Sequence, residues 1–258
     1  MKRTLLILMS IFLTMQLWAQ KESTFATGEW FKFRMSYSGW VKAGEATLEV
    51  REASIDGKPM HHVIGKGRTT GPIAWLFKVE DHYESYFDTI NNLPHRFIRN
   101  IDEGGHTKNL EIDFNQNEQK AYVNDLKHNK KQVLSTKPNV QDMVSAFYYL
   151  RNNYNTDTIE KGDVVSLNMF FDFENYNFKL KFLGHDVIRT KFGKIRCLMF
   201  RPYVLAGRVF KEQESLTLWV SADKNKVPLK IKADLSVGSL RADLVSFKGL
   251  KYPFEIQF

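Results

Sequence analysis

The chain has 258 residues, of which 43% are hydrophobic and 14% are aromatic. This composition excludes a disordered chain and supplies enough apolar side chains for a large core or an apolar cavity. The formal net charge is +8; without Lys2 and Arg3, the 37 basic side chains become 35 against 29 acidic ones, which leaves +6. Because most basic residues are interleaved with acids, we expect a solvated surface and no nucleic-acid partner.

The first nineteen residues have the pattern of a cleavable secretory signal. Two basic residues near the start precede an apolar run from Leu5 to Leu17, and the small residue Ala19 follows. We predict a signal peptide over residues 1–19 that is cleaved near Ala19, and an exported protein of the periplasm or the outer envelope. The apolar run is shorter than the roughly 20 residues that cross a bilayer, so no transmembrane span is expected.

Cys197 is the only cysteine, so the sequence offers neither a disulfide nor a lipid-carrying cysteine beside the predicted cleavage site. Stability therefore has to come from the burial of apolar side chains. We predict a single β-rich domain over residues 20–258. Two half-barrels that meet near residues 125–160 are the alternative organisation.

Two-residue alternation dominates the chain from Trp30 onward. Phe31 and Phe33 alternate with basic residues, which is typical of a half-buried strand, and the same period recurs through residues 79–87 and 97–114. Asp56–Gly57 is a strong signal for a hairpin turn. We therefore predict a meander of antiparallel hairpins in the first half of the chain.

Residues 70–77 interrupt this alternation. Gly71–Pro72 is a turn signal, and a compact apolar group from Ile73 to Phe77 follows it. We predict a short helical turn or a rim loop here, which would form a plug or a lip.

One amphipathic helix is predicted near residues 139–154. Asn139 is the predicted N-cap, and the carboxylate of Asp142 is favourable in the first turn. The predicted apolar stripe consists of Met143, Phe147, Leu150 and Tyr154. Beyond this helix the period returns to two, so the predicted fold is mainly β: an antiparallel open barrel or two curved half-barrels.

Three segments of the chain resemble an exported bacterial family. They are Tyr37–Gly39 with Ala43–Ala46, Asp142–Arg151, and Leu218–Asp223 with Val227–Pro228. Their order and spacing resemble the family catalogued as domain of unknown function 3108. The resemblance implies an all-β, barrel-like fold related to YmcC-type proteins, and it implies no catalytic residues.

Aromatic side chains supply the candidate ligand-lining residues. We expect Trp75, Phe77, Phe147 and Tyr148 to line an apolar pocket covered by the helix, as in open barrels that hold lipid. The alternative is that these rings only fill the core. The function we infer is non-catalytic binding of a lipidic or glycan component of the cell envelope, with no cofactor.

Two other classes of function stay open. An assembly role would use edge strands and the basic loop Lys127–Lys131 to dock another envelope protein. A hydrolase would need two of the carboxylates of Asp81, Asp88, Asp102 and Glu111 on either side of a bond, although we expect no enzyme.

The remaining reactive side chains are expected to be structural. His61–His62 and His82 match no zinc-binding spacing, and adjacent strand residues point to opposite faces, so we expect no metal site. Cys197 lies in a strand pattern, which predicts a buried, inert thiol.

Overall fold

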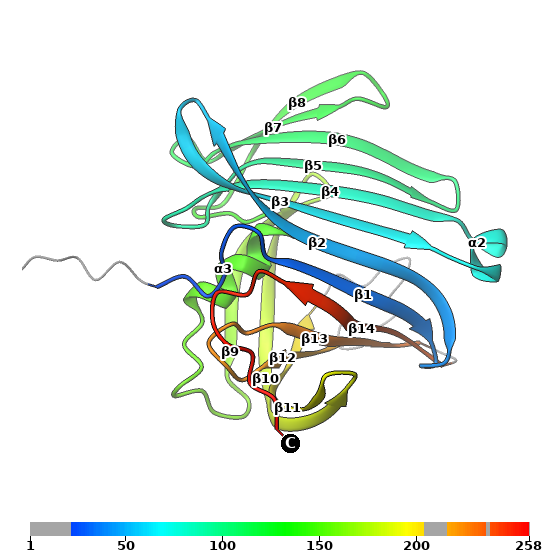
Figure 1. Cartoon of the computed structure of the whole chain (residues 1–258). Helices are drawn as coiled ribbons and strands as arrows, with labels where there is room; N and C mark the ends of the chain where they lie inside the picture. The colour runs from blue at the N-terminus through cyan, green and yellow to red at the C-terminus, as the bar shows by residue number, and fades with distance from the viewer. Residues whose placement is uncertain (1–21, 204–215, 236–237, 258) are drawn as a thin grey trace, which may run out of the picture.

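The computed structural model describes residues 22–203, 216–235 and 238–257, and the predicted signal peptide at 1–19 lies outside these ranges. Within them, 14 strands form one antiparallel sheet (Figure 1). The first half of the sheet comprises β1 (Trp30–Tyr37), β2 (Val41–Ile55), β3 (Lys58–Thr69), β4 (Val79–Asp88), β5 (Pro94–Glu103), β6 (His106–Asn115), β7 (Lys120–Asp125) and β8 (Lys130–Ser135). The second half comprises β9 (Val164–Phe171), β10 (Glu174–Thr190), β11 (Gly193–Tyr203), β12 (Leu216–Ser221), β13 (Pro228–Asp234) and β14 (Ser239–Lys248).

Each half is a meander, and the two halves join where β1 pairs with β14. The order of the strands places β8 at one edge of the sheet and β9 at the other. The sheet bends so that its two halves enclose a helix, α3 (Ser145–Asn153), as Figure 1 shows. The predicted mainly β open barrel is therefore confirmed.

Local sequence signals account for much of this sheet. Phe31 lies opposite Leu48 and Phe33 opposite Ala46, so the apolar members of each alternating pair share the inner face of the sheet. The predicted turn at Asp56–Gly57 has two positive φ angles, 51° and 75°, which match the type I′ turn that joins twisted strands.

The helix α3 begins at Ser145, so the predicted start at Asn139 is wrong. Asn139 has a φ of 52°, which lies outside the helical region. Gln141 then lies along the edge strand β9: its N–H donates to the carbonyl of Asn168 at 2.8 Å, and its carbonyl accepts from the N–H of Phe170 at 2.9 Å. The residues expected to form the first helical turn instead cover part of the free edge of β9.

Away from the β1–β14 pair, the free edge at β9 meets the first half of the sheet through side chains. Phe97 and Phe114 from the first half pack with Phe170 from β9 in one core cluster. Next to this cluster, the guanidinium of Arg99 lies 2.6 Å from the carboxylate of Asp172 in the turn between β9 and β10. The open edge of the barrel therefore rests on a shared core rather than on strand pairing.

The break at residues 70–77 forms α2 (Pro72–Leu76), a helix between β3 and β4 that lies beyond the end of the sheet (Figure 1). None of its residues is buried. In the ranges that the structure describes, no helix has the length and hydropathy needed to cross a membrane.

Candidate functional site

An apolar cavity of about 150 Å³ lies between α3 and the second half of the sheet. The helix contributes Ala146, Phe147 and Leu150 to its lining, and the facing strands contribute further apolar side chains, among them Phe178 and Leu218. Ligand pockets typically measure roughly 300–1,000 Å³, so this cavity is large enough for part of a ligand only. Its contents would be apolar, since apolar atoms form most of its wall.

A polar hollow of about 500 Å³ adjoins the cavity. The two spaces share Tyr154, Thr156 and Lys226 as lining residues. The ammonium of Lys226 donates to the carbonyl of Tyr154 at 2.8 Å, which fixes a positive charge at this shared wall. Lys224 and Asp157 also line the hollow, so a polar space and an apolar space meet at one boundary.

Asp142 sets the start of the helix that forms one wall of the cavity. Its Oδ1 accepts from the N–H groups of Val144 and Ser145 at 2.7 and 2.8 Å, and its Oδ2 accepts from the hydroxyl of Ser85 at 2.6 Å. Burial raises the pKa of Asp142 to about 6, although these hydrogen bonds act in the opposite direction. The capping carboxylate therefore fastens α3 to β4.

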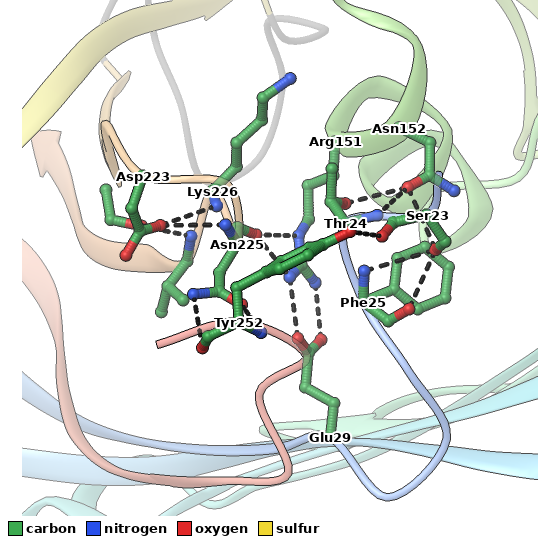
Figure 2. A network of polar contacts seen from close by, with 12 residues as sticks. Ser23, Thr24, Phe25, Glu29, Arg151, Asn152, Asp223, Asn225, Lys226 and Tyr252 are labelled. Carbon is green, nitrogen blue, oxygen red and sulfur yellow. Dashed lines mark hydrogen bonds and ion pairs between the residues drawn. The ribbon is translucent and has the colours of Figure 1, made fainter. Parts of the chain in front are cut away.

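A buried ion pair sets the other end of the helix. The guanidinium of Arg151 lies 2.6 and 2.8 Å from the two carboxylate oxygens of Glu29, and both side chains are almost fully buried (Figure 2). Burial by itself lowers the pKa of Arg151, but the carboxylate of Glu29 outweighs it and raises that pKa. Four rings lie within 5.6 Å of the guanidinium carbon: those of Phe25, Phe31, Phe147 and Tyr148.

This ion pair also connects distant parts of the chain. The Nη2 atom of Arg151, which also bonds to Glu29, donates to the carbonyl of Asn225 at 2.8 Å. Asn225 lies in the turn between β12 and β13. The side chain of Asn225 donates in turn to the carbonyl of Tyr252 at 3.1 Å, near the end of the described chain. Figure 2 shows α3, the segment before β1 and the segment after β14 converging on this network. The helix is therefore held rigidly above the cavity.

The family model described as protein of unknown function (DUF3108) matches residues 32–245. The chain belongs to the DUF3108 family. This match confirms the resemblance seen in the sequence, and it contains the whole described lining of the cavity. A search of the curated proteins finds no match to this DUF3108 protein.

Among solved structures, a beta-barrel-like protein of domain of unknown function DUF1849 from Brucella abortus has a TM-score of 0.56 at 9% identity, covering 88% of this DUF3108 chain and 100% of its own. At this identity the likeness shows the fold alone. A candidate exported protein with a YmcC-like fold from Bacteroides fragilis has a TM-score of 0.35 at 8% identity, covering 87% of this chain and 97% of its own. A candidate lipoprotein from Parabacteroides distasonis has a TM-score of 0.33 at 10% identity, covering 88% and 98%.

The four candidate ligand-lining residues lie in three different environments in this DUF3108 protein. Phe147 lines the cavity. Tyr148 faces the first half of the sheet, where its ring centroid lies 4.6 Å from that of Phe25 and 5.6 Å from that of Phe87. Trp75 and Phe77 are exposed at α2 and are not part of the cavity lining.

Most of the other lining residues occupy positions that the sequence identifies only as part of a strand or a helix. All four residues of the predicted helical stripe line the cavity: Met143, Phe147, Leu150 and Tyr154. The 3.6-residue period of the helix is therefore the signal that finds this wall. The opposite wall comes from β9 to β12, and nothing in their alternation distinguishes a cavity wall from a packed core.

His62 and His82 both form a hydrogen bond with the carboxylate of Glu84 on the sheet. The Nε2 atoms of His62 and His82 both lie 2.6 Å from the carboxylate of Glu84, and the His62 ring stacks on Tyr86 at 4.0 Å between centroids. Burial by itself raises the pKa of Glu84. The hydrogen bonds from His82, His62 and Tyr86 lower it by a larger amount, so the pKa of Glu84 lies below its ordinary value. Among the described residues, no group of three or more histidine, cysteine or acidic side chains is placed to hold a metal ion.

The carboxylates considered for hydrolysis lie in separate environments. Asp88 accepts hydrogen bonds from backbone amides of its own turn, including that of Ile90 at 2.9 Å, and Asp102 accepts one from Gly105 at 3.0 Å. Asp81 lies opposite Ile101, so it points to the other face of the sheet from Asp102. Burial and the nearby carboxylate of Glu103 raise the pKa of Asp81 to about 6.

The remaining candidate acid, Glu111, and the thiol of Cys197 both lie within strands. Glu111 lies opposite Ile98 in the β5–β6 ladder and is half-buried. Cys197 is buried, and burial raises the pKa of its thiol to about 11. A thiol with a raised pKa is a poor nucleophile, which agrees with the predicted inert cysteine.

Proposed function

We propose that this protein binds an amphiphilic component of the cell envelope without chemical turnover, with an alkyl segment in the cavity under α3 and the polar head in the adjoining hollow. The observation that carries this proposal is the shared wall of Tyr154, Thr156 and Lys226, which joins an apolar space to a polar one. An amphiphile has the same division between an apolar chain and a polar head.

The size of the cavity limits what it can hold. A cavity of roughly 150 Å³ lined by Leu, Ile and Phe side chains can stay dry and accept a benzene-sized molecule. The cavity under α3 is of this size and is lined mainly by Leu, Phe and Met side chains, so it suits a short alkyl segment rather than a complete lipid. The rest of such a ligand would occupy the hollow of about 500 Å³.

The charge at the shared wall favours an acidic head group. Lys226 lies at the boundary, so an anionic group there would gain an ammonium neighbour. The hollow beyond it is lined by Lys224 together with the carboxylates of Glu22, Asp157 and Asp223, so the rest of a head group would meet both signs of charge. The proposal includes export to the periplasm or the outer envelope, which the leader pattern at residues 1–19 supports.

The test uses decanoate and decanol as probes, with binding measured by native mass spectrometry and calorimetry. Ala146→Leu and Leu218→Phe both add carbon atoms to the cavity wall, so each should weaken decanoate binding at least tenfold. Two variants are used because either substitution alone could overpack its surroundings. Lys226→Met should weaken the binding of decanoate more than that of decanol, because only decanoate carries a charge.

Tyr149→Phe is the matched control, because Tyr149 lies on the same helix but is not in the cavity lining. This variant should bind decanoate as the wild type does. Equal decanoate binding by Ala146→Leu, Leu218→Phe and the wild type would overturn the proposal. Binding of soluble envelope oligosaccharides that is insensitive to both cavity variants would replace the lipidic ligand with a glycan.

The alternative of docking another envelope protein has weaker support. The edge strand β8 starts with the exposed residues Lys130 and Lys131, which are the last two residues of the predicted basic loop Lys127–Lys131, so the loop is shorter than predicted. Lysines on an edge strand are a common way to prevent pairing with another chain. Their presence therefore has a structural explanation that needs no partner.

A further inference from the structure

Large apolar side chains are exposed at one end of the sheet. The exposed fractions are 91% for Trp75, 84% for Leu76 and 87% for Trp40. Val41 and Phe77 are each 49% exposed. Contiguous exposed apolar side chains mark interaction sites far more often than single ones do. We refer to these five residues as the apolar rim.

The two parts of the apolar rim lie next to each other although they are 34 residues apart in sequence. The N–H of Thr70, just before α2, donates to the carbonyl of Ala43 at 3.0 Å. In Figure 1, α2 and the turn between β1 and β2 lie at the same end of the sheet, and α2 projects beyond the strands. The backbone segments that carry the apolar rim thus lie at one projecting end of the sheet.

Local sequence holds α2 in this projecting position. Gly71 has φ 64° and ψ −151°, a conformation that is essentially restricted to glycine, and Pro72 then fixes the first helical residue. At the other end of α2, the ring of Phe77 lies against Gly104, where any Cβ atom would clash with it. This packing anchors Phe77 and leaves Trp75 and Leu76 facing solvent.

Two lysines flank the apolar rim. Lys42 follows Val41, Lys78 follows Phe77, and both are exposed. The ammonium of Lys78 lies 3.0 Å from the carboxylate of Glu80, a surface pair that water and salt weaken. The rim therefore has exposed tryptophan and leucine side chains with a lysine next to each part of it in the sequence, a combination that suits a membrane surface with lipid phosphates.

We propose that the apolar rim inserts into the surface of a membrane that contains anionic lipid. A protein partner would need a broad complementary face of about 800 Å² on each side, whereas a projecting helix of five residues offers a small convex tip. Indole rings favour the boundary between headgroups and acyl chains, and lysine ammonium groups pair with lipid phosphates. The rim is separate from the cavity under α3, so this inference does not depend on the proposed ligand.

The test measures how much of the exported protein co-sediments with phosphatidylethanolamine vesicles that contain or lack phosphatidylglycerol. The N-terminus of the exported protein is first determined by mass spectrometry. The combined substitution Trp75→Ser and Leu76→Ser should weaken vesicle binding at least tenfold. Lys42→Glu with Lys78→Glu should remove the preference for phosphatidylglycerol. Trp40→Phe with Trp75→Phe should keep binding but abolish the blue shift of tryptophan emission on addition of vesicles.

Ile90→Ser is the matched control, because Ile90 is 78% exposed and lies in the turn at the opposite end of β4 from α2. It should bind vesicles as the wild type does, and the rim variants should still bind decanoate. Equal vesicle binding by the wild type and the Trp75→Ser, Leu76→Ser variant would overturn the inference. The same variant could instead change self-association, measured by size-exclusion chromatography, without changing vesicle binding. That result would also overturn the inference, in favour of contact between copies of the chain.

Discussion

The side of α3 that faces the first half of the sheet is filled, whereas the side that faces the second half leaves a cavity. Tyr148 on the first side is fully buried and packs with Phe25, Val50, Val63 and Phe87. On the second side, Phe147 and Leu150 border the cavity of about 150 Å³.

This difference shows where the protein has committed its rigid contacts. The ion pair of Arg151 with Glu29 holds the last turns of the helix, and the carboxylate of Asp142 holds its start. A helix held at both ends does not need close packing on every side in order to stay in place. Substitutions at the contacts that hold the two ends of α3 should therefore affect stability most, whereas the proposed ligand would occupy the cavity.

The largest effect should follow from breaking the buried ion pair. Glu29→Gln leaves the charge of Arg151 buried without a counter-charge, and Arg151→Met does the same to Glu29. Removing one partner of such a pair typically costs roughly 3–5 kcal/mol, so each variant should lower the free energy of unfolding in urea by about that much.

The double variant Glu29→Met, Arg151→Met sharpens this prediction. Two apolar side chains leave no buried charge, so the double variant should recover most of the loss, apart from the hydrogen bond to the carbonyl of Asn225. Losses in the single variants that simply add in the double variant would show that the two side chains act independently. The filled side of α3 would then not depend on the ion pair.

The sheet could be predicted from the sequence because its signals are local. The alternation from Phe31 onward and the Asp56–Gly57 turn each specify a strand or a hairpin through nearby residues alone. The start of α3 could not be predicted in the same way. The pairing of Gln141 with β9 competes with the helical conformation, and β9 comes 23 residues later in the chain.

The candidate site was only partly predictable for the same reason. Helical periodicity places Met143, Phe147, Leu150 and Tyr154 on one side, and that side lines the cavity. Whether this side meets a packed surface or a void depends on the curvature of a sheet half that is distant in sequence. The rings of Phe147 and Tyr148 touch, at 5.2 Å between centroids, but only Phe147 lines the cavity, because adjacent helical residues point about 100° apart.

A smaller effect should appear as a pH dependence that involves Asp142. Its pKa is about 6 in the folded state against an ordinary value of 3.8, because burial disfavours the charged form. Between these values the unfolded chain has released the proton and the native chain still holds it, so stability should fall as pH rises from about 4 to about 6. One pKa unit corresponds to about 1.4 kcal/mol, so the fall should be on the order of 2–3 kcal/mol.

Asp142→Asn tests this contribution, because the amide oxygen can still accept from the backbone of α3 but does not titrate. The difference in free energy of unfolding between this variant and the wild type should change across the pH window and stay constant above it. Ser85→Ala removes a hydrogen bond that favours the charged carboxylate, so it should extend the window to higher pH. A difference that is independent of pH would show that Asp142 is ionised throughout.

The smallest effect should come from the hydroxyl of Tyr148, and its sign is informative. This oxygen is buried and has no hydrogen-bond partner in the structure, and burial raises the pKa of Tyr148 well above its ordinary value. Removing a buried polar group that lacks a partner relieves a desolvation cost, so Tyr148→Phe should leave stability unchanged or raise it by about 1 kcal/mol.

Tyr86→Phe provides the contrast, because the hydroxyl of Tyr86 donates to the carboxylate of Glu84 at 2.9 Å. That variant should lose about 1 kcal/mol in the free energy of unfolding. A comparable loss in Tyr148→Phe would mean that a buried water pairs with the hydroxyl on the filled side of α3. Both sides of the helix would then contain space beyond the side chains, and the contrast between the packed side and the cavity side would reduce to a difference in polarity.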